Sequence, residues 1–193
     1  VDSILCQIET YVRNINNEDC KRNNMKIILI CLPIIKELSS WCPTKQSLFR
    51  SRYDFILYTL NQVADSKECV VMIRTHPMSD EYNETDIIEE IITEVNKKRE
   101  NRLVNVDQSG KCIEILEELK PKKENLIVIT TDGSIALELA QIGIKCICST
   151  GTYSPEDSYY VPDSINEYKN IIGNKKKYIN KLSKNTMRYS ILY

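Results

Sequence analysis

Short apolar runs alternate along the chain with longer amphipathic stretches. The apolar runs are rich in isoleucine and valine, as buried strands are, and they predict strands at residues 26–32, 69–75, 102–106, 125–130 and 145–149. The amphipathic stretches predict helices at residues 4–15, 44–64, 84–98, 110–119 and 135–141, another from residue 163 or 164, and a last one in the tail from residue 175. Strands that alternate with helices are typical of a parallel sheet. We therefore predict an α/β fold, a Rossmann-like three-layer α/β/α sandwich with a mainly parallel sheet.

This alternation continues without a linker from residue 26 to residue 173, which predicts one domain over 26–173. A lead-in helix and linker would occupy 1–25, and a basic helix 174–193. A chain of 193 residues is long enough for one domain with its own core. Because the first residue is valine and not methionine, one open interpretation is that the sequence is an excised piece of a longer chain.

The charge balance argues against nucleic acid as a partner. The chain has 26 basic and 27 acidic residues, a net charge of −1, and a protein that neutralises many phosphates needs a basic excess. Residues 1–25 lack the apolar region of a signal peptide, and the longest apolar stretch, 27–33, is far shorter than a membrane span. We expect a cytoplasmic protein. A basic tail such as Lys175–Lys177 usually forms a solvated helix face; the alternative is a peripheral position at the inner face of the membrane.

Eight cysteines occur at positions 6, 20, 31, 42, 69, 112, 146 and 148. None of them forms a C-x-x-C pair, and the chain has a single histidine, so zinc-site spacing is absent. We interpret the cysteines as reduced and mostly buried thiols, and we expect no metal site and no cofactor.

The first candidate for chemistry is the segment Arg74-Thr-His-Pro77, at the end of an expected strand. In an extended backbone, Arg74 and His76 point the same way, and a guanidinium beside an imidazole forms a good anion site. The alternative is that His76 is a structural histidine at a strand–loop junction.

The second candidate is the segment Thr131-Asp132-Gly133-Ser134, which links an expected strand directly to a helix. Gly133 permits a tight turn, and the unpaired N–H groups of a helix N-terminus bind phosphate well. Glu138 follows one helical turn later, where a carboxylate could bind ribose hydroxyls. The alternatives are a capped helix with no ligand and a solvated glutamate. Gly143 is the expected end of this helix.

A loop at residues 150–162 adds three tyrosines, Tyr153, Tyr159 and Tyr160. They could stack on a base or line a sugar site. They could equally pack against the sheet.

Taken together, these motifs resemble the carboxyl-terminal domain of GT-B glycosyltransferases. A strand ends in His76-Pro77, and Ser134, Glu138 and Gly143 follow in an S-x-x-x-E-x-x-x-x-G run. The closing segment of the likeness contains Tyr160, Pro162, Ser164, Glu167 and Tyr168. The likeness is strongest to capsular polysaccharide transferases of the Kdo and sialic acid type and to CDP-glycerol glycerophosphotransferases.

This resemblance implies the donor-binding half of a glycosyltransferase that takes a sugar from a nucleotide-activated donor, CMP-linked, for capsule or surface polysaccharide. Its implied donor-binding residues are Arg74, His76, Pro77, Thr131, Asp132, Gly133, Ser134 and Glu138, with His76 as the catalytic group. The implied partners are the donor, a glycan or lipid-linked acceptor, and an amino-terminal GT-B domain or partner chain that supplies the general base. The alternatives are a CDP-glycerol-type phosphotransferase and a non-catalytic nucleotide-binding domain.

Overall fold

The computed structural model describes residues 26–36, 47–64, 69–98, 103–105, 126–131, 134–141, 143–144, 146–150 and 159–173. The helices expected at 4–15, at 110–119 and in the tail lie outside these residues, as do Asp132, Gly133 and Tyr153. The expected boundaries of the domain at 26 and 173 stay predictions.

The described strands form one five-stranded sheet, in which every neighbouring pair is parallel. Its strands are β1 (Lys26–Cys31), β2 (Cys69–Arg74), β3 (Leu103–Asn105), β4 (Leu126–Thr130) and β5 (Cys146–Cys148). Their order across the sheet is β3-β2-β1-β4-β5. The central strand β1 and its neighbour β4 are paired along residues 27–30 and 126–129 and are buried on both faces, which explains their continuous apolar sequences.

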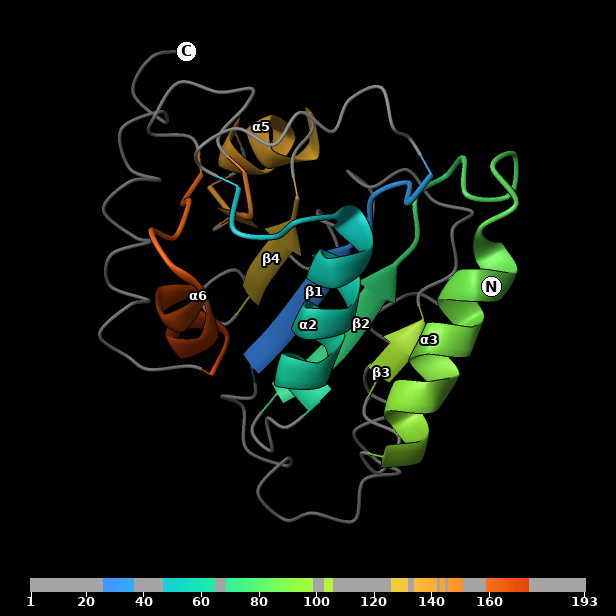
Figure 1. Cartoon of the computed structure of the whole chain (residues 1–193). Coiled ribbons are helices and arrows are strands. Elements are labelled where there is room, and N and C mark those ends of the chain that lie inside the picture. Colours follow the sequence, from blue (N-terminus) through green and yellow to red (C-terminus); the bar gives the residue numbers. More distant parts are fainter. Residues whose placement is uncertain are drawn as a thin grey trace.

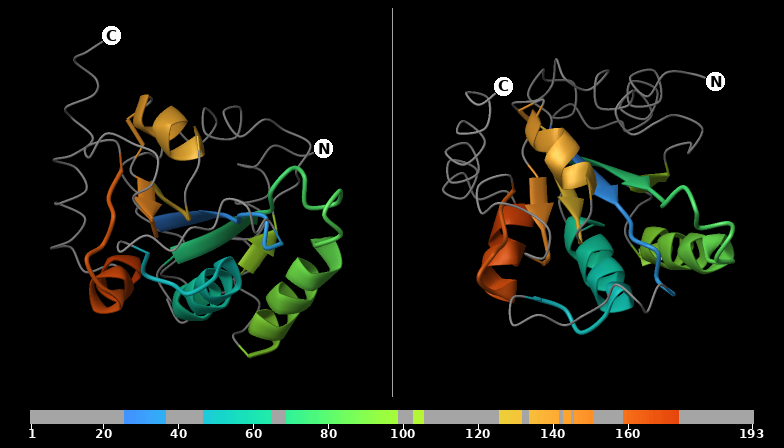
Figure 2. Two further views of the ribbon diagram at one scale, coloured as in Figure 1. Left: turned by 45° about the horizontal axis from the view of Figure 1, so that its top comes forward. Right: turned by 90° about the horizontal axis from the view of Figure 1, so that it is seen from above.

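Helices cover both faces of this sheet, as expected for a three-layer sandwich (Figures 1 and 2). The described helices are α2 (Arg52–Ala64), α3 (Thr85–Lys98), α5 (Ser134–Gln141) and α6 (Ile165–Ile172). α2, α3 and α6 lie on one face, and α5 lies on the other (Figure 2). The predicted α/β/α architecture with a parallel sheet is therefore confirmed.

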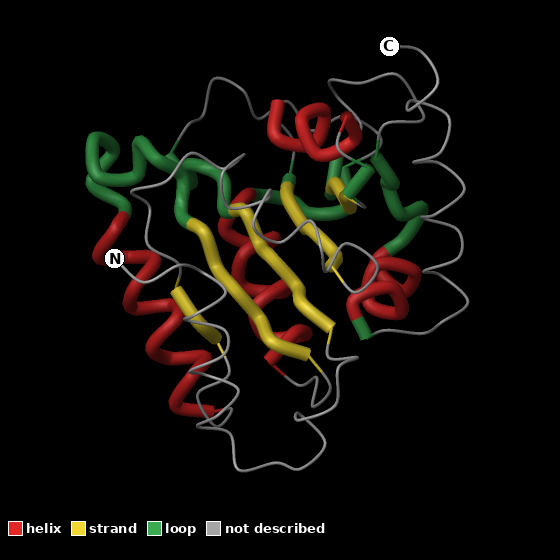
Figure 3. Tube along the Cα trace, turned by 180° about the vertical axis from the view of Figure 1, so that it is seen from behind, coloured by secondary structure: helices red, strands yellow, loops and turns green. Residues whose placement is uncertain are grey.

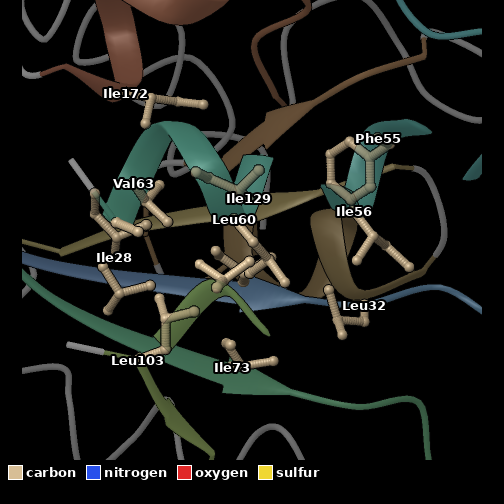
Figure 4. Close-up of a cluster of buried hydrophobic side chains, with 14 of the residues drawn as sticks. Ile28, Leu32, Phe55, Ile56, Leu60, Val63, Ile73, Leu103, Ile129 and Ile172 are labelled. Atoms are coloured by element: carbon tan, nitrogen blue, oxygen red, sulfur yellow. The ribbon is translucent and has the colours of Figure 1, made fainter. Parts of the chain in front are cut away.

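Successive residues of β1 divide between two apolar cores, one on each face of the sheet. Ile28 and Ile30 belong to the core under α2, α3 and α6, together with Leu60 and Ile73 (Figure 4). Leu29 and Cys31 belong to the core on the face of α5. Cys146 and Cys148 are buried in this second core, as expected for two cysteines two positions apart on a strand.

α2 begins eight residues later than the 44–64 pattern predicts, at Arg52. Its first turn is capped by Ser51, whose hydroxyl accepts the N–H of Asp54 at 3.0 Å. The preceding residues serve the core in a non-helical segment: Phe49 is buried, and the N–H of Leu48 donates to the carbonyl of Ser149 at 3.3 Å. The apolar residues before Ser51 thus belong to a loop, and the prediction of a helix from residue 44 is wrong for residues 47–51.

The ends of the other described helices lie close to their expected positions. Ser164 caps α6 by accepting the N–H of Glu167 at 3.1 Å, and the Glu167 carboxylate accepts the N–H of Asp163 at 2.8 Å. Gly143 follows α5 with φ +73°, a left-handed conformation that glycine adopts without strain. The expected helix end at Gly143 is confirmed.

Candidate functional site

The strand order locates the point where a ligand is expected. From β1 the chain proceeds outward to β2 and β3, and then returns to the other side of β1 to form β4 and β5. In parallel sheets ligands bind beyond the carboxyl ends of the strands at such a reversal, here between β1 and β4. The segments that follow β1 and β2 lie at this end of the sheet (Figure 3).

The segment after β2 contains the first group of predicted site residues. Arg74 is the last residue of β2 and is only 8% exposed, and its carbonyl accepts the N–H of Leu32 at 2.8 Å. His76 is half-buried, and Pro77 is exposed. Because the strand ends at Arg74, two residues before His76, a common direction for their side chains stays a prediction.

The backbone of a tight turn holds the His76 side chain. The Nδ1 atom of His76 accepts the N–H of Met78 at 3.2 Å, and the backbone carbonyl of His76 accepts the N–H of Ser79 at 2.9 Å. An imidazole nitrogen that accepts a hydrogen bond carries no proton, so the neutral ring has its proton on Nε2. The turn thus selects the tautomer in which His76 is a hydrogen-bond donor through Nε2.

The segment after β4 contains the second group. Thr131 is fully buried, and its carbonyl accepts both the N–H of Thr150 at 3.1 Å and the Thr150 hydroxyl at 3.2 Å. These bonds attach the residues after β5 to the end of β4. α5 begins at Ser134, so the expected strand-to-helix connection is present and the N-terminus of α5 lies at the carboxyl edge.

Some predicted ligands in this second group are not described. Asp132, Gly133 and the side chain of Ser134 lie outside the described residues. Glu138 is half-buried in the middle of α5, an exposure that fits neither a fully solvated residue nor a core residue. The roles of these four residues stay predictions.

Sequence reasoning missed the segment after β1, Leu32–Lys36, although it lies at the reversal point itself. The N–H groups of Ile35 and Lys36 both donate to the carboxylate of Glu84, at 2.7 Å for Ile35. On the other side, Arg52 of α2 donates from Nη1 to the carbonyl of Ile34 at 2.7 Å. Glu84 is 48 residues from Lys36, so no local pattern could reveal this contact.

The described tyrosines of the 150–162 loop are packed against the sheet. Tyr160 packs against the core under α2, and its hydroxyl donates to the Glu167 carboxylate on α6. Tyr159 packs against the core on the face of α5. These contacts favour the packing interpretation over base stacking for both residues.

The described residues hold no group of three or more histidine, cysteine, aspartate or glutamate side chains placed to bind a metal ion. None of the helices assigned within them is long and apolar enough to cross a membrane.

No protein-family model matches the sequence, and no curated protein matches it. Solved structures do resemble the chain, among them that of a variant of the wall teichoic acid polymerase TagF, with 12% sequence identity and a TM-score of 0.48. The similarity covers 94% of this chain and 42% of that one, so the chain spans less than half of the polymerase structure's length. The assignment to the α/β class rests on the parallel sheet and its strand order.

Proposed function

We propose that this chain is the donor-binding half of a GT-B-type glycosyltransferase that uses a nucleotide-activated sugar. The observation that carries the proposal is the arrangement at the carboxyl edge. The turn with His76 follows β2, the N-terminus of α5 follows β4, and β1 lies between them at the reversal of the sheet. Crevices of this kind bind nucleotides in parallel α/β proteins.

The chemistry of these groups suits the phosphates of a nucleotide donor. Arg74 brings a permanent positive charge, and His76 brings an N–H on Nε2 that can donate. The N-terminus of α5 brings backbone N–H groups of the kind that bind phosphate. When the bond between sugar and phosphate breaks, negative charge grows on the phosphate. Hydrogen-bond donors and positive charges of the protein that are already in place stabilise that charge electrostatically, without a metal ion. In this proposal Pro77, Thr131, Asp132, Gly133 and Ser134 shape the phosphate site, and Glu138 binds the ribose.

The segment after β1 supports this placement of the phosphate. Its N–H groups at Ile35 and Lys36 already donate to Glu84 and are not available to a ligand while that contact persists. This contact supports the proposal that the phosphate binds at the His76 turn and the N-terminus of α5.

The finer assignment follows from the sequence motifs. The donor is proposed to be a CMP-linked sugar, and the acceptor a glycan or lipid-linked glycan of a capsule or surface polysaccharide, reached from the cytoplasmic side of the membrane. The acceptor site and the general base would come from an amino-terminal GT-B domain or a partner chain.

Calorimetric titration of CMP, CDP, UDP and GDP tests the donor site. We expect a cytidine nucleotide to bind, and His76→Ala to weaken its binding by about 1.5–3 kcal/mol, the usual contribution of a hydrogen bond to a charged group. Lys97→Ala is the matched control, because Lys97 is an exposed cation near the end of α3, and this end of the helix is remote from the carboxyl ends of the strands (Figure 1). If a folded sample binds none of the four nucleotides, the proposal is wrong.

Product analysis then separates sugar transfer from phosphotransfer. With a CMP-linked sugar, the acceptor gains a sugar and no phosphorus. With CDP-glycerol, it gains a glycerophosphate unit, and the mass difference identifies which reaction occurs. The non-catalytic alternative requires nucleotide binding with no product from either donor, even with the acceptor-binding half present.

A further inference from the structure

Glu84 is a fully buried carboxylate that receives two consecutive backbone N–H groups. It is 0% exposed and lies directly before α3. Its carboxylate accepts the N–H of Ile35 at 2.7 Å through one oxygen and the N–H of Lys36 through the other. Consecutive amides directed at one anion form a small anion-binding site. In this protein that site, at the end of β1, is filled by the protein's own carboxylate.

The same two segments are joined a second time, here by a side chain of the β1 loop that donates to backbone carbonyls of the segment before α3. The Lys36 Nζ atom donates to the carbonyl of Tyr82 at 3.1 Å and to the carbonyl of Asn83 at 2.9 Å. Asn83 has φ +52°, which turns the chain between Tyr82 and Glu84. We call the contacts of Glu84 and Lys36 across these segments the Glu84 clasp.

Hydrogen bonds connect the Glu84 clasp to the imidazole of His76. The N–H of Glu84 donates to the carbonyl of Ser79 at 2.9 Å, and the N–H of Ser79 donates to the carbonyl of His76 at 2.9 Å. The same turn includes the N–H of Met78, which donates to the His76 Nδ1 atom at 3.2 Å. The turn that orients His76 is thus anchored at its far end by Glu84 to the loop after β1.

We propose that Glu84 is a positioning residue for His76. It holds the turn against the β1 loop, so that Met78 stays bonded to Nδ1 and Nε2 keeps its proton for the ligand. The effect on nucleotide binding rests on the proposed function; the effect on the imidazole does not. A purely structural Glu84 would change stability and leave the state of the His76 ring unaltered.

Because His76 is the only histidine of the chain, its ring gives a single set of imidazole signals in a long-range ¹H–¹⁵N NMR spectrum. We expect the wild-type signals at neutral to alkaline pH to show the Nε2–H tautomer. In Glu84→Gln one acceptor oxygen is lost, so the signals should move toward a mixture of the two tautomers. Glu81→Gln is the matched control, an exposed acid in the same turn that should leave them unchanged. Wild-type imidazole signals in a folded Glu84→Gln protein would overturn the proposal.

A double-mutant cycle measured with the cytidine nucleotide tests the consequence for binding. We expect Glu84→Gln to weaken binding about 10-fold, the equivalent of one hydrogen bond of ordinary strength. In a His76→Ala background the same change should have almost no further effect, since Glu84 acts through His76. Equal losses in both backgrounds would contradict the positioning role. If the wild type binds no nucleotide, the proposed function fails and the imidazole spectrum alone decides the role of Glu84.

Two further variants cover the case in which Glu84→Gln does not fold. Glu84→Asp keeps the charge on a side chain too short to reach both N–H groups. Lys36→Met keeps the Glu84 carboxylate and removes the two bonds to the carbonyls of Tyr82 and Asn83. Both should shift the imidazole signals in the same direction by smaller amounts. If neither shifts them, Glu84 does not position His76.

Discussion

A buried hydrogen bond between α2 and α6 gives the sharpest test of the packing. The Tyr168 hydroxyl lies 2.7 Å from the Thr59 Oγ1 atom, and both residues are fully buried. The Tyr168 ring also packs edge-on against Phe49, with 5.4 Å between the ring centroids. The bond thus joins α6 to α2 inside the larger core, where water cannot replace either partner.

Tyr168→Phe removes the hydroxyl and keeps the ring. It loses the net stabilisation of the bond, about 1 kcal/mol, and leaves the Thr59 hydroxyl buried without a partner, at a cost of about 1–3 kcal/mol. We therefore expect the free energy of unfolding to fall by about 2–4 kcal/mol. Thr59→Val should have a similar effect, because it leaves the tyrosine hydroxyl unpaired. In the double variant neither hydroxyl remains to be left unpaired, so its loss should be only about 1 kcal/mol, at least about 3 kcal/mol less than the sum of the single losses.

Urea unfolding followed by circular dichroism measures all four proteins of this cycle. Tyr53→Phe is the control, because Tyr53 lies on the outer side of α2 with 42% of its surface exposed, and its loss should be within about 0.5 kcal/mol of zero. Single losses that simply add in the double variant would show that Tyr168 and Thr59 are not coupled, and would refute the assigned hydrogen bond.

The remaining stability predictions concern pH and two serines. Burial raises the pKa of Tyr168 above its ordinary value of 10.0, so above pH 10 only the unfolded state ionises there and stability falls. The stability difference between the wild type and Tyr168→Phe should shrink by about 1.4 kcal/mol per pH unit above pH 10, measured by urea unfolding; a constant difference would contradict the shift. The Ser79 hydroxyl is buried and has no hydrogen-bond partner among the described residues, so Ser79→Ala should not lower the melting temperature. Ser164→Ala removes the cap of α6 and should lower the free energy of unfolding by about 1 kcal/mol, measured by urea unfolding.

The sheet could be predicted from the sequence because both of its faces are covered. A strand buried on two sides is apolar at nearly every position, as in β4, and such runs stand out from amphipathic helices. All five expected strands are present, with ends within one residue of their expected positions. The strand order could not be read from these runs, because it depends on which strands pair in space.

The start of α2 shows where local patterns are ambiguous. Leu48 fits the apolar spacing of the helix that follows, yet it lies in a loop that packs on the sheet. The capping signal of Ser51 with Asp54 at its third helical position is present in the sequence, but the longer apolar pattern obscures it. A pattern of apolar positions identifies what is buried and does not by itself separate a helix from a loop.

Some parts of the candidate site could be predicted from local sequence patterns, and others could not. His76 and the connection from β4 to α5 could be found from the sequence, because each stands beside a strand end with distinctive neighbours. Glu84 could not, because it reads as an ordinary acid at the start of an amphipathic helix. Its role comes from contact with residues nearly 50 positions away, and only the parallel pairing of β1 with β2 brings those segments together.

The Glu84 clasp leads to a last prediction about where a phosphate binds. In Rossmann-like sheets the segment after the first strand usually donates backbone N–H groups to the ligand's phosphate. Here Glu84 holds the amides of Ile35 and Lys36, and two anions cannot share them. On nucleotide addition we therefore expect the amide NMR signals of Thr131 and the first turn of α5 to shift, with those of Ile35 and Lys36 nearly unchanged. The opposite pattern would mean that the phosphate displaces Glu84, and both the site assigned beside His76 and the positioning role of Glu84 would be wrong.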